Sequence, residues 1–227
     1  MPYSEEYSKM APIRSAINIA EKLNNKSFTD IKKTELMGKA LGRKSQTSIL
    51  FVVDASGSMG VEDLMIKTKG LVFEILKDAY IMRERVGFIT FRGTQAKVIL
   101  HFTKSIEMAK EKLKDIKTGG KTPLSRAMER AYLEIEKEIR KEKDNEIVLL
   151  IFSDGRANIS VTGMDPFEEA VAIARKFSEK KVKTFVVDTD PTWIHYPYAK
   201  DLAKAIKGKY LKLKDILDGN IRELIYD

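Results

Sequence analysis

Short apolar runs alternate with helical patterns from residue 47 to the end of the chain. Runs such as Ile49–Val53 and Ile147–Phe152 are strand-sized and apolar throughout, as in strands that are covered on both faces. Parallel strands need a long crossover connection, which is usually a helix. The repeated order of strand then helix therefore predicts an α/β fold, with a largely parallel sheet and helices on both faces.

The periodicity and the turn residues place the expected elements. Strands are expected at Ser48–Asp54, Arg85–Phe91, Ala96–Phe102, Ile147–Ser153, Val182–Asp188 and Tyr210–Leu213. Helices are expected at Val61–Met82, Ser105–Ile116, Pro123–Arg140, Pro166–Lys180, Tyr198–Ile206 and Leu217–Ile225. Only Arg92-Gly93-Thr94-Gln95 separates the second strand from the third, which suits a hairpin and predicts one antiparallel edge strand.

The domain organisation is simple, because 227 residues suit one core with a short appendage. Residues 1–46 differ from the rest: Pro12 can open a helix, Ile13–Leu23 has helical apolar spacing, and Asn24–Gln46 is polar and basic. We expect a basic helical extension or linker over residues 1–46 and the globular domain over residues 47–227.

Composition excludes several classes of protein. The chain has no cysteine, so thiolate ligands and disulfides are excluded. The net charge of +8 comes from Lys and Arg interleaved with Glu along helices, which favours a solvated surface over a nucleic-acid interface. The apolar runs fall far short of the ~20 residues of a membrane helix, and the acidic, polar start Met1–Glu6 is unlike a secretory signal. We expect a cytoplasmic protein that does not contact nucleic acid or membrane.

Three clusters of oxygen-bearing side chains follow expected strands or open helices. They are Asp54-Ala55-Ser56-Gly57-Ser58, Gly119-Gly120-Lys121-Thr122-Pro123 and Ser153-Asp154-Gly155. Ligands in open α/β sheets bind outside the carboxyl ends of the strands, so Asp54 and Asp154 are expected to meet in space. Mg²⁺ prefers such oxygen ligands in an octahedron at about 2.0–2.1 Å, with some water retained.

These clusters together resemble the von Willebrand factor A domain and its metal-ion-dependent adhesion site, an Asp-x-Ser-x-Ser motif with a distant Thr and Asp. The resemblance implies a Rossmann-like, doubly wound, mostly parallel six-stranded sheet. It also implies that Ser56, Ser58 and Thr122 bind Mg²⁺ directly or through water, while Asp54 and Asp154 contribute negative charge. An open coordination position then takes an Asp or Glu from a partner protein. Mn²⁺ and Ca²⁺ remain alternatives to Mg²⁺.

A narrower resemblance, over roughly Lys44–Leu213, is to the D subunit of magnesium and cobalt chelatases. Its segments are Phe51–Met59, Gly119–Leu124 and Asp154–Asn158, with support from Phe91-Arg92-Gly93 and Val187-Asp188-Thr189. This implies a non-catalytic, Mg²⁺-dependent interaction module that works with an AAA-type ATPase subunit and a large chelatase subunit. We expect Arg156, Asn158 and Lys121 to form the partner-binding rim of the metal site.

Other interpretations stay open. Asp54–Ser58 alone is compatible with an ordinary helix N-cap, although Thr122 and Asp154 in matching positions favour the metal. A stand-alone adaptor or scaffold that captures an acidic partner loop is an alternative, which neighbouring genes would distinguish from a chelatase subunit. More remotely, Asp188-Thr189-Asp190-Pro191-Thr192 resembles the aspartyl nucleophile motif of haloacid-dehalogenase-like phosphatases, with Asp188 as nucleophile.

Overall fold

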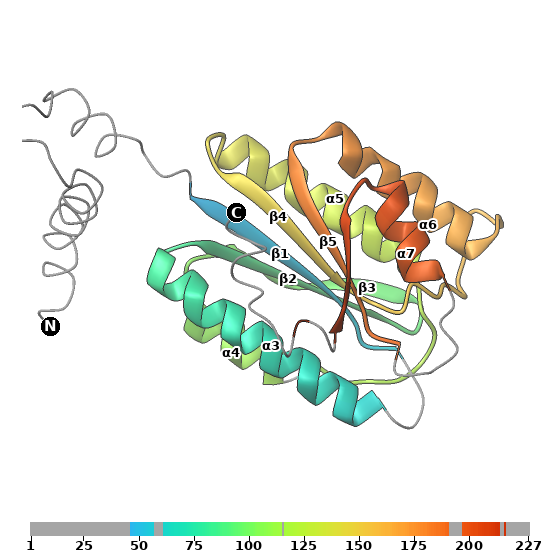
Figure 1. The fold of residues 1–227 in the computed structure, drawn as a ribbon, viewed down its shortest axis with the longest axis horizontal. Helices are drawn as coiled ribbons and strands as arrows, with labels where there is room; N and C mark the ends of the chain where they lie inside the picture. Colours follow the sequence, from blue (N-terminus) through green and yellow to red (C-terminus); the bar gives the residue numbers. More distant parts are fainter. Residues whose placement is uncertain (1–45, 57–60, 115, 191–196, 214–215, 217–227) are drawn as a thin grey trace, which may run out of the picture. The chain divides into compact units, whose positions relative to one another are not determined.

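The computed structural model describes residues 46–56, 61–114, 116–190, 197–213 and 216 (Figure 1). Its strands are β1 (Thr47–Asp54), β2 (Arg85–Arg92), β3 (Gln95–Thr103), β4 (Glu146–Phe152), β5 (Val182–Asp188) and β6 (Lys209–Lys212). Its helices are α3 (Val61–Met82), α4 (Ile106–Lys114), α5 (Leu124–Lys141), α6 (Pro166–Ala174), the 3₁₀ segment η2 (Arg175–Glu179) and α7 (Tyr198–Ala205). The predicted extension up to residue 45, the predicted last helix and Ser58 lie outside the described residues.

The strands form one six-stranded sheet in the order β3-β2-β1-β4-β5-β6. All neighbouring pairs are parallel except β2 and β3, which form the hairpin that the short connection predicted. β1 pairs with β2 from Ser48 opposite Arg85 to Asp54 opposite Phe91, and with β4 from Thr47 opposite Glu146. The α/β fold class and the antiparallel edge strand expected from the sequence are confirmed.

Helices cover both faces of this sheet (Figure 1). Alternate residues of β1 enter two separate cores, because successive side chains of a strand point to opposite faces. Phe51 packs in the core beneath α3 and α4, where its ring stacks on Phe88 at a centroid distance of 4.8 Å. Val52 packs in the core beneath α5, α6 and α7. Burial on both sides explains why β1 and β4 are continuously apolar.

One predicted helix is shorter than expected. The pattern from Pro166 to Lys180 predicted a single helix, but α6 ends at Ala174 and the chain continues as a 3₁₀ segment. Short 3₁₀ segments are frequent at helix ends, where the hydrogen-bond ladder tightens. The start of α6 is well defined. Asp165 accepts hydrogen bonds from the backbone N–H groups of Phe167 and Glu168, and Pro166 occupies the first helical position.

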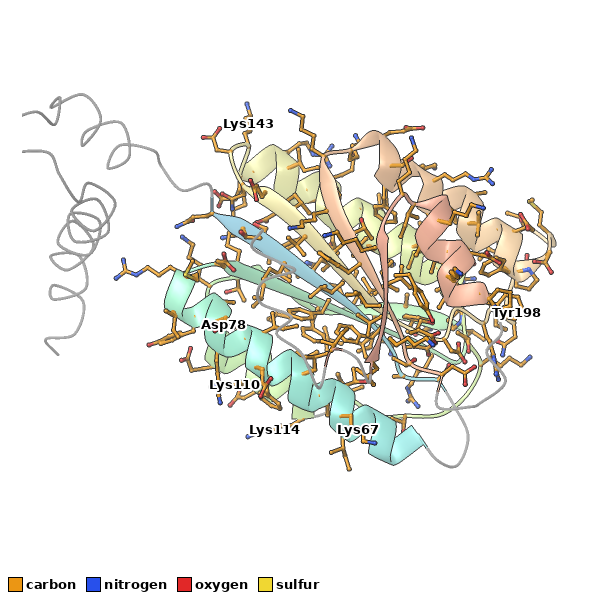
Figure 2. All side chains as sticks on the ribbon, in the orientation of Figure 1. Lys67, Asp78, Lys110, Lys114, Lys143 and Tyr198 are labelled. Atoms are coloured by element: carbon orange, nitrogen blue, oxygen red, sulfur yellow. The ribbon has the colours of Figure 1, made fainter. Side chains whose placement is uncertain are left out.

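The strand order reverses next to β1. From β1 the chain proceeds to β2 and β3 on one side, and β4, β5 and β6 lie on the other side. The carboxyl ends of β1 and β4 therefore flank the crevice in which open α/β sheets bind ligands. In Figure 2, Lys143, which precedes β4, and Tyr198, which begins α7, lie at opposite ends of the domain, with Tyr198 at the carboxyl ends of the strands. Among the described helices, none has the length and apolar character needed to cross a bilayer.

Candidate metal centre

The first loop of the candidate site is set by Asp54, the last residue of β1. Its Oδ1 atom accepts a hydrogen bond of 2.8 Å from the backbone N–H of Ser56, which makes a tight Asx turn. The backbone N–H of Ala55 donates to the carbonyl of Phe91 at 3.0 Å, so the turn continues the pairing of β1 with β2. The sheet and the Asx turn together fix where the Ser56 hydroxyl lies.

The second loop brings Thr122 to Ser56. The two hydroxyl oxygens lie 2.6 Å apart although 66 residues separate them in the chain. Thr122 is held on its far side by Asn158, whose side-chain Oδ1 accepts from the Thr122 backbone N–H at 2.7 Å. The backbone N–H of Asn158 donates in return to the Thr122 carbonyl at 3.2 Å. The backbone of Thr122 is therefore held by both the side chain and the backbone of Asn158, in a third loop.

That third loop follows β4 and carries Asp154. The backbone N–H of Arg156 donates to Asp154 Oδ1 at 2.9 Å, a second Asx turn. The Arg156 guanidinium lies 3.4 Å from Asp154 Oδ2 and 3.5 Å from Asp190 Oδ2. The Asp154 side chain keeps 28% of its surface exposed, so a cation can reach it from solvent.

Ser153 links the first and third loops, a role that the sequence did not indicate. Its hydroxyl donates to Asp54 Oδ2 at 3.1 Å and accepts from the backbone N–H of Gly155 at 3.1 Å. The only sequence signal was its place in the Ser-Asp-Gly cluster that ends the strand. Both oxygens of Asp54 are thus hydrogen-bonded, one within its own loop and one across the sheet to β4.

Gly155 lets α7 approach this loop closely. Its φ is +78°, and a Cβ built there would lie 2.3 Å from the backbone nitrogen of Ala199 and 2.5 Å from the carbonyl carbon of Tyr198. No side chain fits at such distances, so glycine is required both by the backbone conformation and by the space. The first turn of α7 consequently packs directly on the candidate site.

The electrostatics of the site disfavour negative charge when no cation is bound. Burial raises the pKa of the Asp54 carboxyl from 3.8 to about 7, although hydrogen bonds from Ser56 and Ser153 partly oppose the shift. Repulsion from the Asp154 carboxylate raises the pKa of Asp54 further. Burial also raises the pKa of Asp154, and the neighbouring carboxylates of Asp190 and Asp188 raise it further. A divalent cation between Asp54 and Asp154 would relieve both penalties.

The described residues fit a small oxygen-binding cation. Ser56 and Thr122 offer two neutral hydroxyl ligands beside the carboxylates of Asp54 and Asp154, whose pKa values are both raised, and Mg²⁺ prefers such hard ligands. Within the described part of the chain, no three His, Cys, Asp or Glu side chains group closely enough to hold a metal by themselves. The site would therefore depend on its hydroxyls, with carboxylates as a minority of the ligands.

The three predicted rim residues differ in the contacts that they make. Asn158 supports the backbone of Thr122, and Arg156 pairs with Asp154 and Asp190, so both act within the loops. Lys121 is exposed next to Thr122. Their contacts with a partner protein stay a prediction.

Asp188 has the environment of a structural carboxylate. It is buried at the end of β5, accepts a hydrogen bond of 2.6 Å from the Tyr210 hydroxyl and another of 2.9 Å from the backbone N–H of Asp190. Both of its oxygens are thus engaged in holding β6 and the following turn. Nothing in this arrangement favours a phosphatase nucleophile.

Comparison with known proteins identifies the family. Residues 49–156 match the model of the von Willebrand factor type A domain, a span that holds Asp54, Ser56, Thr122 and Asp154. The chain belongs to the von Willebrand factor type A family. An uncharacterized protein of Methanocaldococcus jannaschii is 34% identical over 167 residues, which is 73% of this chain and 95% of that protein. The family expected from the sequence is confirmed.

The narrower resemblance is confirmed as a similarity to magnesium-chelatase subunits. The magnesium-chelatase 67 kDa subunit of Chlorobaculum parvum is 35% identical over 181 residues, which is 75% of this chain and 29% of the subunit. Across the chelatase subunits that match, this von Willebrand factor type A chain spans from 29% to 33% of their length.

The solved structures agree on the fold. The manganese-loaded TRAP protein of Plasmodium vivax superposes with a TM-score of 0.57 over 77% of this chain and 71% of that one, at 14% identity. At this identity the similarity concerns the architecture of the von Willebrand factor type A domain alone.

Proposed function

We propose that this chain is a Mg²⁺-dependent protein-interaction module, whose metal site captures an acidic side chain of a partner protein. The observation that carries the proposal is the contact between the Ser56 and Thr122 hydroxyls beside the Asp54 carboxylate. Three loops converge to form this contact, whereas a helix N-cap would need only the loop that carries Asp54 and Ser56. The manganese-loaded state of the TRAP protein, which has the same fold, supports a divalent cation as the ligand.

The proposed ligands divide into two kinds. Ser56, Ser58 and Thr122 hold the ion directly or through water, and Asp54 and Asp154 supply negative charge. When bound, Mg²⁺ acts as a Lewis acid that attracts a further oxygen ligand. Because only two carboxylates balance its charge, the site stays close to neutral and retains affinity for an external Asp or Glu. Mn²⁺ and Ca²⁺ are the alternative ions.

Similarity to magnesium-chelatase subunits supports a place for this module in a chelatase-like machine. The proposed partners are an AAA-type ATPase subunit and a large chelatase subunit, and the module itself is not catalytic. We propose a cytoplasmic setting for this assembly. The positions of the described residues are compatible with this role, because β1 and β4 are parallel neighbours and open α/β sheets bind ligands at the carboxyl ends of such strands.

The proposal is tested by isothermal titration of Mg²⁺ into metal-free protein, followed by partner binding. Wild type is compared with Asp54→Ala and with Asp144→Ala, which removes an exposed carboxylate from the turn before β4. We expect Asp54→Ala alone to abolish Mg²⁺ binding and the Mg²⁺-dependent retention of a purified AAA-type ATPase subunit from the same organism. Equal Mg²⁺ binding by wild type and Asp54→Ala, with circular dichroism unchanged, would refute the metal site.

A further inference from the structure

A basic groove lies beside the candidate metal centre, along the β2–β3 hairpin and the end of α4. It consists of two adjoining cavities of about 520 and 410 Å³, which share Thr90, Arg92 and Lys97. One end is lined by Gly119 and Gly120, and the other by Lys112 and Lys117. We call this surface the hairpin groove.

The hairpin groove is positively charged throughout. Its cations are Arg92, Lys97, Lys112 and Lys117, all exposed, and no Asp or Glu occurs among the described residues that line it. Within the described part of the chain, none of the four makes an ion pair. Arg92 donates one hydrogen bond of 3.3 Å to the carbonyl of Thr118, which holds its guanidinium over the groove. The four charges therefore add to one another.

A second groove on the opposite side of β3 provides a contrast. It has a volume of about 610 Å³ and lies between β3 and α5. Its cations are Arg126, Arg130, Lys137 and Lys97, the last of which also lines the hairpin groove. Two carboxylates accompany them: Glu129, and Glu134, which pairs with Lys137 at 2.8 Å. Two carboxylates therefore offset half of the positive charge in the second groove, whereas no carboxylate among the described lining residues offsets that of the hairpin groove.

The hairpin groove adjoins a loop of the candidate site. The backbone N–H of Gly119, at its inner end, donates to the carbonyl of Ala55 at 2.8 Å, one residue before Ser56. Gly120 has a φ of +99°, and a Cβ on it would meet the backbone nitrogen of Gly93 at 3.2 Å. The hairpin turn therefore packs against the loop that leads to Thr122. A chain that reaches the metal centre can continue into the groove without leaving the surface.

We infer that the hairpin groove binds an extended, acid-rich segment of the partner protein, adjacent to the residue that reaches the metal. This inference rests on the proposed function for the position of the partner, and on the groove's own charge for the segment's chemistry. Complementary charge increases the association rate and selects against other partners. A single-stranded nucleic acid fits less well, because the described residues that line the groove include no aromatic side chain for base stacking.

The test measures the binding of a fluorescein-labelled peptide of alternating Glu and Asp, about ten residues and so about 33 Å when extended. Fluorescence anisotropy is recorded in MgCl₂ and in EDTA at matched ionic strength. Wild type is compared with Lys112→Glu/Lys117→Glu, which changes only the hairpin groove. Arg126→Glu/Arg130→Glu reverses the same number of charges in the second groove and is the matched control. All four positions are exposed, and circular dichroism checks each fold.

We expect Lys112→Glu/Lys117→Glu to weaken peptide binding by about tenfold or more, and the control variant by less than about threefold. Equal losses in both variants would overturn the inference, because they would reflect overall charge. If peptide binding depends on Mg²⁺ but is unchanged in Lys112→Glu/Lys117→Glu, the role of the groove is refuted and the proposed metal site is not. Binding that EDTA does not weaken, but that the groove variant loses, would support the groove and count against metal-dependent capture. Stronger binding of an oligothymidylate of equal charge would overturn the choice of an acidic protein segment.

Discussion

The hydroxyl oxygens of Ser56 and Thr122 lie 2.6 Å apart and join two loops that are 66 residues apart in sequence. Each hydroxyl is positioned independently: Ser56 by the Asx turn of Asp54, and Thr122 by the side chain of Asn158. The contact between the two hydroxyls is therefore a consequence of how the loops pack, and not the cause of that packing. A pair of hydroxyls held in this way loses little freedom when both become ligands of one cation.

Thr122→Val should weaken Mg²⁺ binding by about tenfold or more, which corresponds to about 1.4 kcal/mol. Valine keeps the shape of threonine but removes the hydroxyl that contacts Ser56. Isothermal titration measures the change, with Thr118→Val in the preceding exposed loop as the matched control. Unchanged affinity in Thr122→Val would show that Thr122 is a packing residue only.

Asn158→Ala should lower Mg²⁺ affinity although Asn158 is not a proposed ligand. The substitution removes the acceptor of the Thr122 backbone N–H, a loss that costs about 1–3 kcal/mol when the donor stays buried. Asn158→Asp keeps an acceptor oxygen and is the control. If alanine leaves Mg²⁺ binding intact but weakens partner binding, Asn158 acts at the rim, as the sequence suggested.

Asp54→Asn should stabilise the metal-free protein above neutral pH. Between pH 3.8 and about 7 the folded chain retains a proton on Asp54 that the unfolded chain has lost, so this residue lowers the free energy of unfolding as pH rises. Asparagine has no charge to bury. In EDTA at pH 8 the free energy of unfolding of the variant should therefore exceed that of wild type by about 1–3 kcal/mol, and at pH 4 the two should be equal.

Thermal unfolding in EDTA and in MgCl₂ measures this effect. Mg²⁺ should raise the melting temperature of wild type and leave that of Asp54→Asn unchanged, because a ligand stabilises only the state that binds it. Asp144→Asn, in an exposed turn, should behave as wild type in both buffers. A destabilised Asp54→Asn at pH 8 in EDTA would mean that the charged carboxylate contributes favourably without metal.

Mg²⁺ affinity should also depend on pH. Since the pKa of Asp54 in the metal-free protein is about 7, protons compete with the cation below this value, and affinity should fall by up to about tenfold for each pH unit. Above about pH 8 the affinity should level off. Titrations in buffers with different ionisation enthalpies report the proton released on binding. Constant affinity from pH 6 to 8 would mean that Asp54 is already ionised at pH 6 or does not take part in binding the ion.

The sequence predicts some parts of this site better than others. Asp54 ends β1 and Asp154 lies two residues after the end of β4, and the geometry of parallel sheets brings such strand ends together, so their proximity could be predicted. Ser153 and Asn158 act through hydrogen bonds whose partners depend on the conformations of loops. No periodicity encodes those conformations. The hairpin groove was missed for a related reason, since its four cations come from β2, β3, α4 and the following loop.

Gly155→Ala should be much more damaging than Gly163→Ala, although both glycines have positive φ, +78° and +86°. A Cβ on Gly163 meets no described atom within 4 Å. The free energy of unfolding of Gly163→Ala should therefore fall only by the cost of placing alanine in a left-handed backbone conformation, about 1–2 kcal/mol. A Cβ on Gly155 would overlap the backbone of Ala199 and force α7 away from the loop of Asp154. Thermal unfolding should show a clearly larger loss for Gly155→Ala, accompanied by weaker Mg²⁺ binding. Equal losses in the two variants would mean that α7 does not pack on the candidate site in solution.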